Sequence, residues 1–158
     1  MRKYAVIMLS LIPVLVFGQS LPDQMSAHPW TGSGILMGSP ATFEMHWRWE
    51  LGKRFLKLEF QNKRETADGK EIVFKAHAYY KAVGDSLYEG TWFDSRGVTF
   101  PLRGVVRHNE FIVEWGSEET ELGRTVYTVQ SPGEMKVTDF IFRDDRHIKF
   151  GEAAYRKK

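Results

Sequence analysis

Apolar side chains occupy every second position in short segments that follow one another through most of this 158-residue chain. In residues 43–50 apolar and charged side chains alternate without a break, and similar alternation recurs in residues 56–61, 72–79, 111–115 and 137–141. A period of two predicts antiparallel strands with one face in a core and the other face in water. No convincing window of ten or more residues has the 3.6-residue period of a helix.

Turn-forming residues separate these segments at short intervals, and Gly, Pro, Asn, Asp and Ser are frequent among them. Nine such turns imply about ten short strands, and no internal repeat, low-complexity tract or linker divides the chain. We therefore predict an all-β chain whose residues 30–158 form a single antiparallel up-and-down β-barrel of about 8–10 strands. Closure into a barrel would also hide the edges of the sheet. The turns are at residues 38–40, 51–53, 67–69, 83–86, 94–97, 107–109, 116–118, 131–133 and 143–145.

Trp30 opens the first predicted strand and is followed closely by Gly32 and Gly34. A bulky indole can close one end of a barrel, and glycines allow a neighbouring backbone to approach closely. Residues 19–29 precede this strand as a polar lead-in, in which Pro22 and Pro29 oppose a helix.

The first 18 residues have the pattern of a cleaved secretory signal peptide. Basic residues 2–3 precede an apolar run over residues 5–17, and small side chains at positions 16 and 18 permit cleavage before Gln19. The run is shorter than the roughly 20 residues that span a bilayer, which argues against a membrane anchor. We therefore expect residues 1–18 to be removed and the protein to be secreted or periplasmic.

The composition excludes several classes of partner and site. The chain has no cysteine, which excludes a lipoprotein anchor, disulfides, thiolate metal sites and cysteine nucleophiles. Its net charge of +2 comes from 22 Lys and Arg against 20 Asp and Glu, and Arg2 and Lys3 lie in the leader, so the remainder is neutral. A neutral domain with interspersed charges has no net electrostatic attraction to nucleic acid or to an anionic membrane, so we expect neither as a partner.

The opening Trp-x-Gly-x-Gly, the run of short strands and the closing Tyr155-Arg156 resemble the lipocalin-like, or calycin, barrels. The chain is most similar to small secreted bacterial barrels of that group whose function is unknown. Nitrobindin-type haem barrels open similarly and are more distant. The resemblance implies that Arg156 packs over Trp30 and closes one end of the barrel, a cation–π contact of about 0.5–2 kcal/mol. The family ends Tyr-x-Arg, whereas here tyrosine and arginine are adjacent.

The inward face of such a barrel either fills the interior or lines a cavity for one small molecule. We expect the aromatic face to point inward, because large aromatic side chains are the costlier ones to leave in water. If the face of Glu44, His46, Arg48 and Glu50 pointed inward instead, a polar cavity would result. The leading hypothesis is a non-enzymatic barrel that binds or carries a small hydrophobic molecule, and the alternative is a structural or interaction module with a filled core. The candidate cavity residues are Phe43, Met45, Trp47, Trp49, Phe74, Trp92 and Trp115.

The histidines do not form a metal site in the sequence. None of His28, His46, His77, His108 and His147 has the spacing of paired metal ligands, so we predict no metal site and no cofactor. A nitrobindin-like haem barrel would need an axial histidine near the C-terminal end. His147 is the nearest candidate, but its surroundings do not match the haem segment of that family.

Gly84-Asp85-Ser86-Leu87 resembles the nucleophile block of GDSL-type esterases, and Asp144 and His147 have the Asp-x-x-His spacing of the other two triad members. The resemblance implies Ser86 as nucleophile, His147 as base and Asp144 as its orienting carboxylate. That family needs an α/β sheet with helices, which this pattern lacks, and Gly-Asp-Ser is common in turns. We therefore predict that the match is coincidental and that the protein is not an enzyme.

Overall fold

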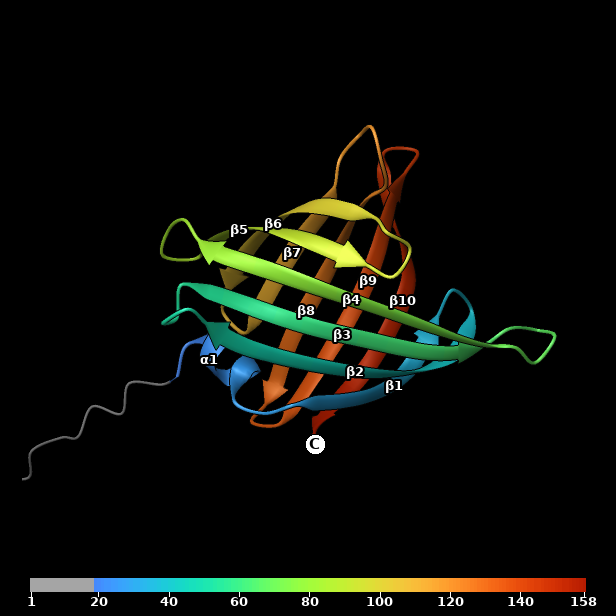
Figure 1. The fold of residues 1–158 in the computed structure, drawn as a ribbon, viewed down its shortest axis with the longest axis horizontal. Helices are drawn as coiled ribbons and strands as arrows, with labels where there is room; N and C mark the ends of the chain where they lie inside the picture. The colour runs from blue at the N-terminus through green and yellow to red at the C-terminus, as the bar shows by residue number, and fades with distance from the viewer. Residues whose placement is uncertain (1–18) are drawn as a thin grey trace, which may run out of the picture.

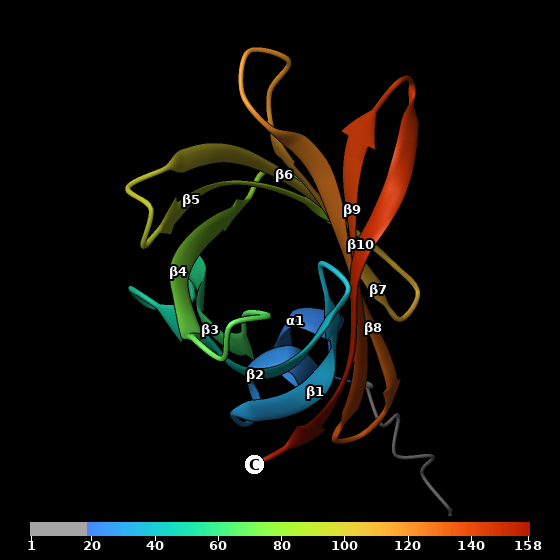
Figure 2. The same cartoon turned by 90° about the vertical axis from the view of Figure 1, so that its right-hand side faces the viewer.

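The computed structural model describes residues 19–158, so the predicted signal peptide at residues 1–18 lies outside the described residues. Ten antiparallel strands form a closed barrel in which each strand pairs with its neighbours along the chain and β1 pairs with β10 (Figures 1 and 2). This confirms the predicted all-β, single up-and-down barrel. The strands are β1 (Trp30–Leu36), β2 (Ser39–Glu50), β3 (Phe55–Glu65), β4 (Glu71–Ala82), β5 (Leu87–Asp94), β6 (Thr99–Arg107), β7 (Glu110–Gly116), β8 (Leu122–Ser131), β9 (Glu134–Arg143) and β10 (Arg146–Lys157).

Side-chain alternation along each strand divides the interior from the surface. In β2 the side chains of Phe43, Met45 and Trp47 are buried, whereas Glu44 is exposed. The aromatic face therefore points inward, as predicted, and the alternative with a polar interior is wrong. The alternation places the hydrophobic side chains of all ten strands on one continuous inner surface.

A seam between β1 and β10 closes the barrel, and two glycines make it possible. Gly34 pairs with Ala153, and a Cβ atom added at Gly34 would lie 2.0 Å from the carbonyl oxygen of Glu152. Gly32 pairs with Tyr155, whose ring covers the space that a side chain would need. The glycines of the opening motif thus let the first and last strands approach closely.

One short helix, α1 (Leu21–Ser26), lies before β1 and contacts β2 at one end of the barrel (Figure 1). The expectation that Pro22 opposes a helix here is wrong. The proline lies in the first turn, where its missing N–H would have no helical partner, and the Ser20 hydroxyl accepts a hydrogen bond from the Asp23 N–H as the N-cap. Leu21, Pro22 and Met25 are the buried face of the helix.

Successive turns alternate between the two ends of the barrel. The β2–β3, β4–β5, β6–β7 and β8–β9 turns lie at the α1 end, which we call the closed end. The β1–β2, β3–β4, β5–β6, β7–β8 and β9–β10 turns lie at the other end, which we call the open end, and its β7–β8 and β9–β10 hairpins project beyond the barrel (Figures 1 and 2). No helix within residues 19–158 is both long and apolar enough to cross a membrane.

Candidate functional site: a cavity in the open half of the barrel

The closed half of the barrel is filled by packed side chains. Trp47 is 0 % exposed, and its ring centroid lies 5.8 Å from Tyr80, 6.1 Å from Phe111 and 5.1 Å from Tyr127. Helix α1 caps this half: the Trp30 indole donates to the Met25 carbonyl oxygen at 2.8 Å. For this half of the molecule, the filled-core interpretation describes the packing.

The contact predicted between Arg156 and Trp30 is wrong. Arg156 lies opposite Thr31 in the β1–β10 ladder and is exposed, whereas Trp30 is 1 % exposed and points inward. Because tyrosine and arginine are adjacent here, Tyr155 takes the inward position and the arginine points outward. The imidazole of His28 lies over the Trp30 indole instead, at 4.5 Å between ring centroids.

The open half of the barrel contains a cavity of about 380 Å³. This volume is at the small end of the 300–1,000 Å³ that is usual for ligand pockets. Tyr80, Tyr127 and Met45 line the cavity and separate it from the packed half, where Trp47 contacts the two tyrosine rings from the other side. The barrel is thus filled at one end and hollow at the other.

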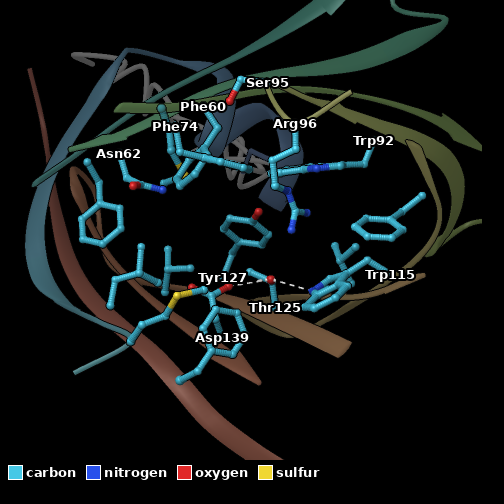
Figure 3. A pocket seen from close by; sticks show the side chains of 18 of the residues that line it. Phe60, Asn62, Phe74, Trp92, Ser95, Arg96, Trp115, Thr125, Tyr127 and Asp139 are labelled. Carbon is cyan, nitrogen blue, oxygen red and sulfur yellow. Dashed lines mark hydrogen bonds between the residues drawn. The ribbon is translucent and has the colours of Figure 1, made fainter. Parts of the chain in front are cut away.

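Aromatic side chains form much of the cavity wall. Phe60, Phe74 and Trp92 are neighbours on β3, β4 and β5, with ring centroids 6.1–6.4 Å apart. Trp115 lies across the cavity from Phe60 and Phe74 (Figure 3) and packs on Phe100 at 5.8 Å. An aromatic wall of this kind favours a flat or apolar molecule.

Five of the seven predicted cavity residues line this cavity and two do not. Phe43, Met45, Phe74, Trp92 and Trp115 line it. Trp47 lies in the packed half, and the Trp49 indole donates to the Asp23 carboxylate of α1 at 2.9 Å. The alternating pattern identified the inward face of β2 but not how far along the barrel axis each residue lies.

A chain of polar groups that the sequence analysis did not single out lies on one side of the cavity. The Trp115 indole donates to the Thr125 hydroxyl at 3.2 Å, and that hydroxyl donates to the Asp139 carboxylate at 2.7 Å (Figure 3). Asp139 is half-buried on the inner face of β9 and lines the cavity. Burial raises the pKa of Asp139 to about 6, although the hydrogen bond from Thr125 acts in the opposite direction.

Asn62 is a second polar group in the cavity wall. Its side chain is 5 % exposed, and its Oδ1 atom has no hydrogen-bond partner among the described residues. Asn62 thus adds an amide group to a wall that is otherwise mostly apolar.

Arg96 lies at the open end and lines the mouth of the cavity. Its guanidinium bonds to the Asp94 carboxylate at 2.8 Å and to Glu121 of the β7–β8 turn at 3.3 Å, and it stacks over Phe74 at 5.7 Å. Burial raises the pKa of Asp94, but the hydrogen bonds from Arg96 outweigh it and leave that pKa below its ordinary value. Both carboxylates therefore compensate the positive charge at the mouth.

The residues of the esterase and haem hypotheses do not converge. Ser86 lies in the β4–β5 turn at the closed end, whereas Asp144 and His147 lie at the β9–β10 turn at the open end. His147 is exposed, packs on Phe142 at 5.2 Å, and is not among the residues that line the cavity. Within residues 19–158, no three His, Asp or Glu side chains are grouped so that they could hold a metal ion.

Comparisons with known proteins establish the fold and no more. No family profile and no curated protein matches the sequence. Among solved structures, the chain is similar to Rv2717c from M. tuberculosis, with a TM-score of 0.60 and 14% sequence identity over 83% of this chain and 91% of that one. At this identity the likeness shows a shared barrel fold and leaves the family of this chain open.

Proposed function

We propose that this protein is a lipocalin-like barrel that binds one small, largely apolar molecule in the open half of its interior. The observation that supports this most directly is the cavity of about 380 Å³, which is lined by aromatic side chains and bounded on one side by the packed, closed half of the barrel. A barrel that served only as a structural module would have no need to leave this volume empty, because well-packed interiors are more stable.

Binding of the neutral fluorescent probe N-phenyl-1-naphthylamine tests the proposal. We expect one saturable site, with enhanced probe emission and energy transfer from Trp92 and Trp115, which line the cavity. Val137 also lines the cavity, so Val137→Phe should fill part of it and weaken probe binding by about tenfold or more.

The matched control is Val126→Phe on the same sheet. Val126 is flanked in β8 by the inward residues Thr125 and Tyr127, so its own side chain lies on the outer face. This variant should bind the probe as the unmodified protein does. The proposal is wrong if the unmodified protein has no saturable site for this probe or for 1-naphthylmethylamine, or if the two variants bind the probe equally well.

A further inference from the structure

The cavity is apolar over most of its wall, yet it contains a carboxylate that no cation among the described residues neutralises. Within residues 19–158, Asp139 takes part in no ion pair, and the hydrogen bond it receives comes from the uncharged Thr125. The cationic groups that line the cavity are Arg64 and Arg96. Arg96 is bound by two other carboxylates, and the Arg64 guanidinium donates to the Met37 sulfur at the open end.

Asp139 has hydrogen-bond acceptor capacity in the cavity wall that no described residue fills. A carboxylate has two oxygens and accepts several hydrogen bonds, and Asp139 receives one from Thr125 at Oδ1. The Asn62 amide and the hydroxyls of three tyrosines also border the cavity, and they offer donors as well as acceptors: Tyr80, Tyr127 and Tyr155. The tryptophan N–H groups in the wall are already engaged, Trp115 with Thr125 and Trp92 with Asp94. A cationic ligand that donates hydrogen bonds would satisfy Asp139, whereas the Asp139 carboxylate would repel an anionic one.

The remaining wall suits a cation as well. Phe60, Phe74, Trp92 and Trp115 present aromatic surfaces to the same cavity, and aromatic faces attract organic cations. A protonated amine would supply both a positive charge and hydrogen-bond donors to Asp139.

From this geometry, and resting on the proposed binding function, we infer that the preferred ligand is an organic amine with a flat or short apolar body, whose ammonium group binds Asp139 beside Thr125. The body lies against the aromatic wall. Asp139 is then the residue that determines specificity.

Three competitors with one naphthalene body test the inference. 1-Naphthylmethylamine, 1-naphthalenemethanol and 1-naphthoic acid differ in the charge of a one-carbon head group, and each is titrated against bound N-phenyl-1-naphthylamine at pH 7.5. We expect the amine to displace the probe at a concentration at least about tenfold below the alcohol and the acid. In Asp139→Asn this preference should disappear, while the affinity for the neutral probe stays within about twofold, because the probe does not depend on the charge.

Glu121→Gln is the matched control, because Glu121 is the cavity carboxylate bound by Arg96 at the mouth. It should keep the amine preference. If the preference disappears in this variant and survives in Asp139→Asn, the amine binds at the mouth and the inference is wrong. If the acid competes best, Arg96 is the anchor and the inference is also wrong.

The pH dependence provides an independent measurement. The titratable side chains that face Asp139 are Tyr127 on β8 and Tyr155 on β10, and burial raises both of their pKa values further above the working range. Asp139 is therefore the facing group that gains a proton between pH 7.5 and pH 5, where its charge is lost. The amine preference should shrink over this interval in the unmodified protein and in Glu121→Gln.

Failure of the inference is distinguishable from failure of the proposed function. If the probe binds and the three competitors displace it equally, the cavity binds apolar molecules and the amine assignment is wrong. If the probe does not bind, direct calorimetry with 1-naphthylmethylamine decides: saturable heat that vanishes in Asp139→Asn supports the inference, and its absence overturns both.

Discussion

At the scale of a single residue, the ionised Asp139 carboxylate lowers the stability of the folded protein, because ionisation among apolar side chains is unfavourable. Its pKa of about 6 lies above the ordinary 3.8, so the folded protein holds this proton more tightly than the unfolded chain does. The sign follows from linkage: the destabilisation is fully present above pH 6, declines as the pH falls, and is absent below pH 3.8. A carboxylate retained at such a cost supports a role in binding.

Asp139→Asn should therefore stabilise the protein at pH 7.5 by on the order of 1–3 kcal/mol, since it removes the buried charge and keeps an acceptor for Thr125. The difference in free energy of unfolding between variant and unmodified protein, measured by urea denaturation, should shrink steadily towards pH 4. Asp23, Glu59 and Asp94 have lowered pKa values and lose stabilisation in acid, but they are present in both proteins and cancel in the difference. A difference that is constant with pH would contradict the assignment of the raised pKa to Asp139.

The polar residues of the cavity could have been predicted from the sequence, although we did not predict them. Asp139 shares the inward alternation of Val137 and Ile141, and Asn62 continues the inward series of Leu58 and Phe60. A charged or amide side chain on an otherwise apolar face is the signal that would have indicated them. The positions of Trp47 and Trp49 along the barrel axis could not be predicted, because a period of two specifies only the face of a strand on which a side chain lies.

At the scale of secondary-structure elements, helix α1 covers the filled end of the barrel. Met25 is 0 % exposed, and its carbonyl oxygen accepts the hydrogen bond from Trp30. Asp23 links the helix to β2 through Trp49 and lies 3.6 Å from the Lys53 amine of the β2–β3 turn. Ser20 and Asp23 have the Ser-x-x-Asp spacing of a helix start, a signal that the two prolines obscured in the sequence analysis.

Met25→Ala should lower the free energy of unfolding by about 2–4 kcal/mol, because it leaves a void against the barrel end. The same variant should bind N-phenyl-1-naphthylamine with unchanged affinity, since Met25 does not line the cavity. Gln24→Ala is the neighbouring control: the Gln24 side chain donates only an exposed hydrogen bond to the Gln19 carbonyl oxygen, so its loss should cost less than about 0.5 kcal/mol. Equal effects of the two substitutions on urea denaturation would show that α1 does not seal the barrel.

At the scale of the whole molecule, the alternation and the nine turn signals were sufficient to predict a closed barrel of about 8–10 strands, a range that includes the ten observed. Each predicted turn coincides with or adjoins a connection between consecutive strands, and the order along the sheet follows the order along the chain. Local patterns succeed in this topology because nine of the ten strand pairings join sequence neighbours. The register irregularity between Lys149 and Gly151 was not predictable in this way, and Phe150, the residue within it, lines the cavity beside Trp115.

Closure of the whole barrel depends on the tenth pairing, and Gly34→Ala tests that dependence. The added methyl group would overlap the Glu152 carbonyl oxygen and the Ala153 backbone, so the seam must open locally. We expect a loss of about 2 kcal/mol or more in unfolding free energy and faster amide exchange along β1 and β10. Gly84→Ala is the control, because the nearest atom there is Leu87 Cβ at 3.6 Å, an ordinary contact, and stability should stay within about 0.5 kcal/mol.

The β1–β10 seam also determines when, during synthesis, the last strand edge of the barrel becomes paired and can no longer pair with another copy of the chain. Strand β1 emerges early and has β2 as a partner on one side, but its other edge stays unpaired until β10 has been synthesised. Contacts between segments so distant in sequence form slowly, and an unpaired strand edge can pair with another copy of the chain in the meantime. The risk of misassembly is therefore greatest between the synthesis of the first strand and that of the last. The risk falls when β10 pairs with β1, where Gly32 and Gly34 allow the close approach.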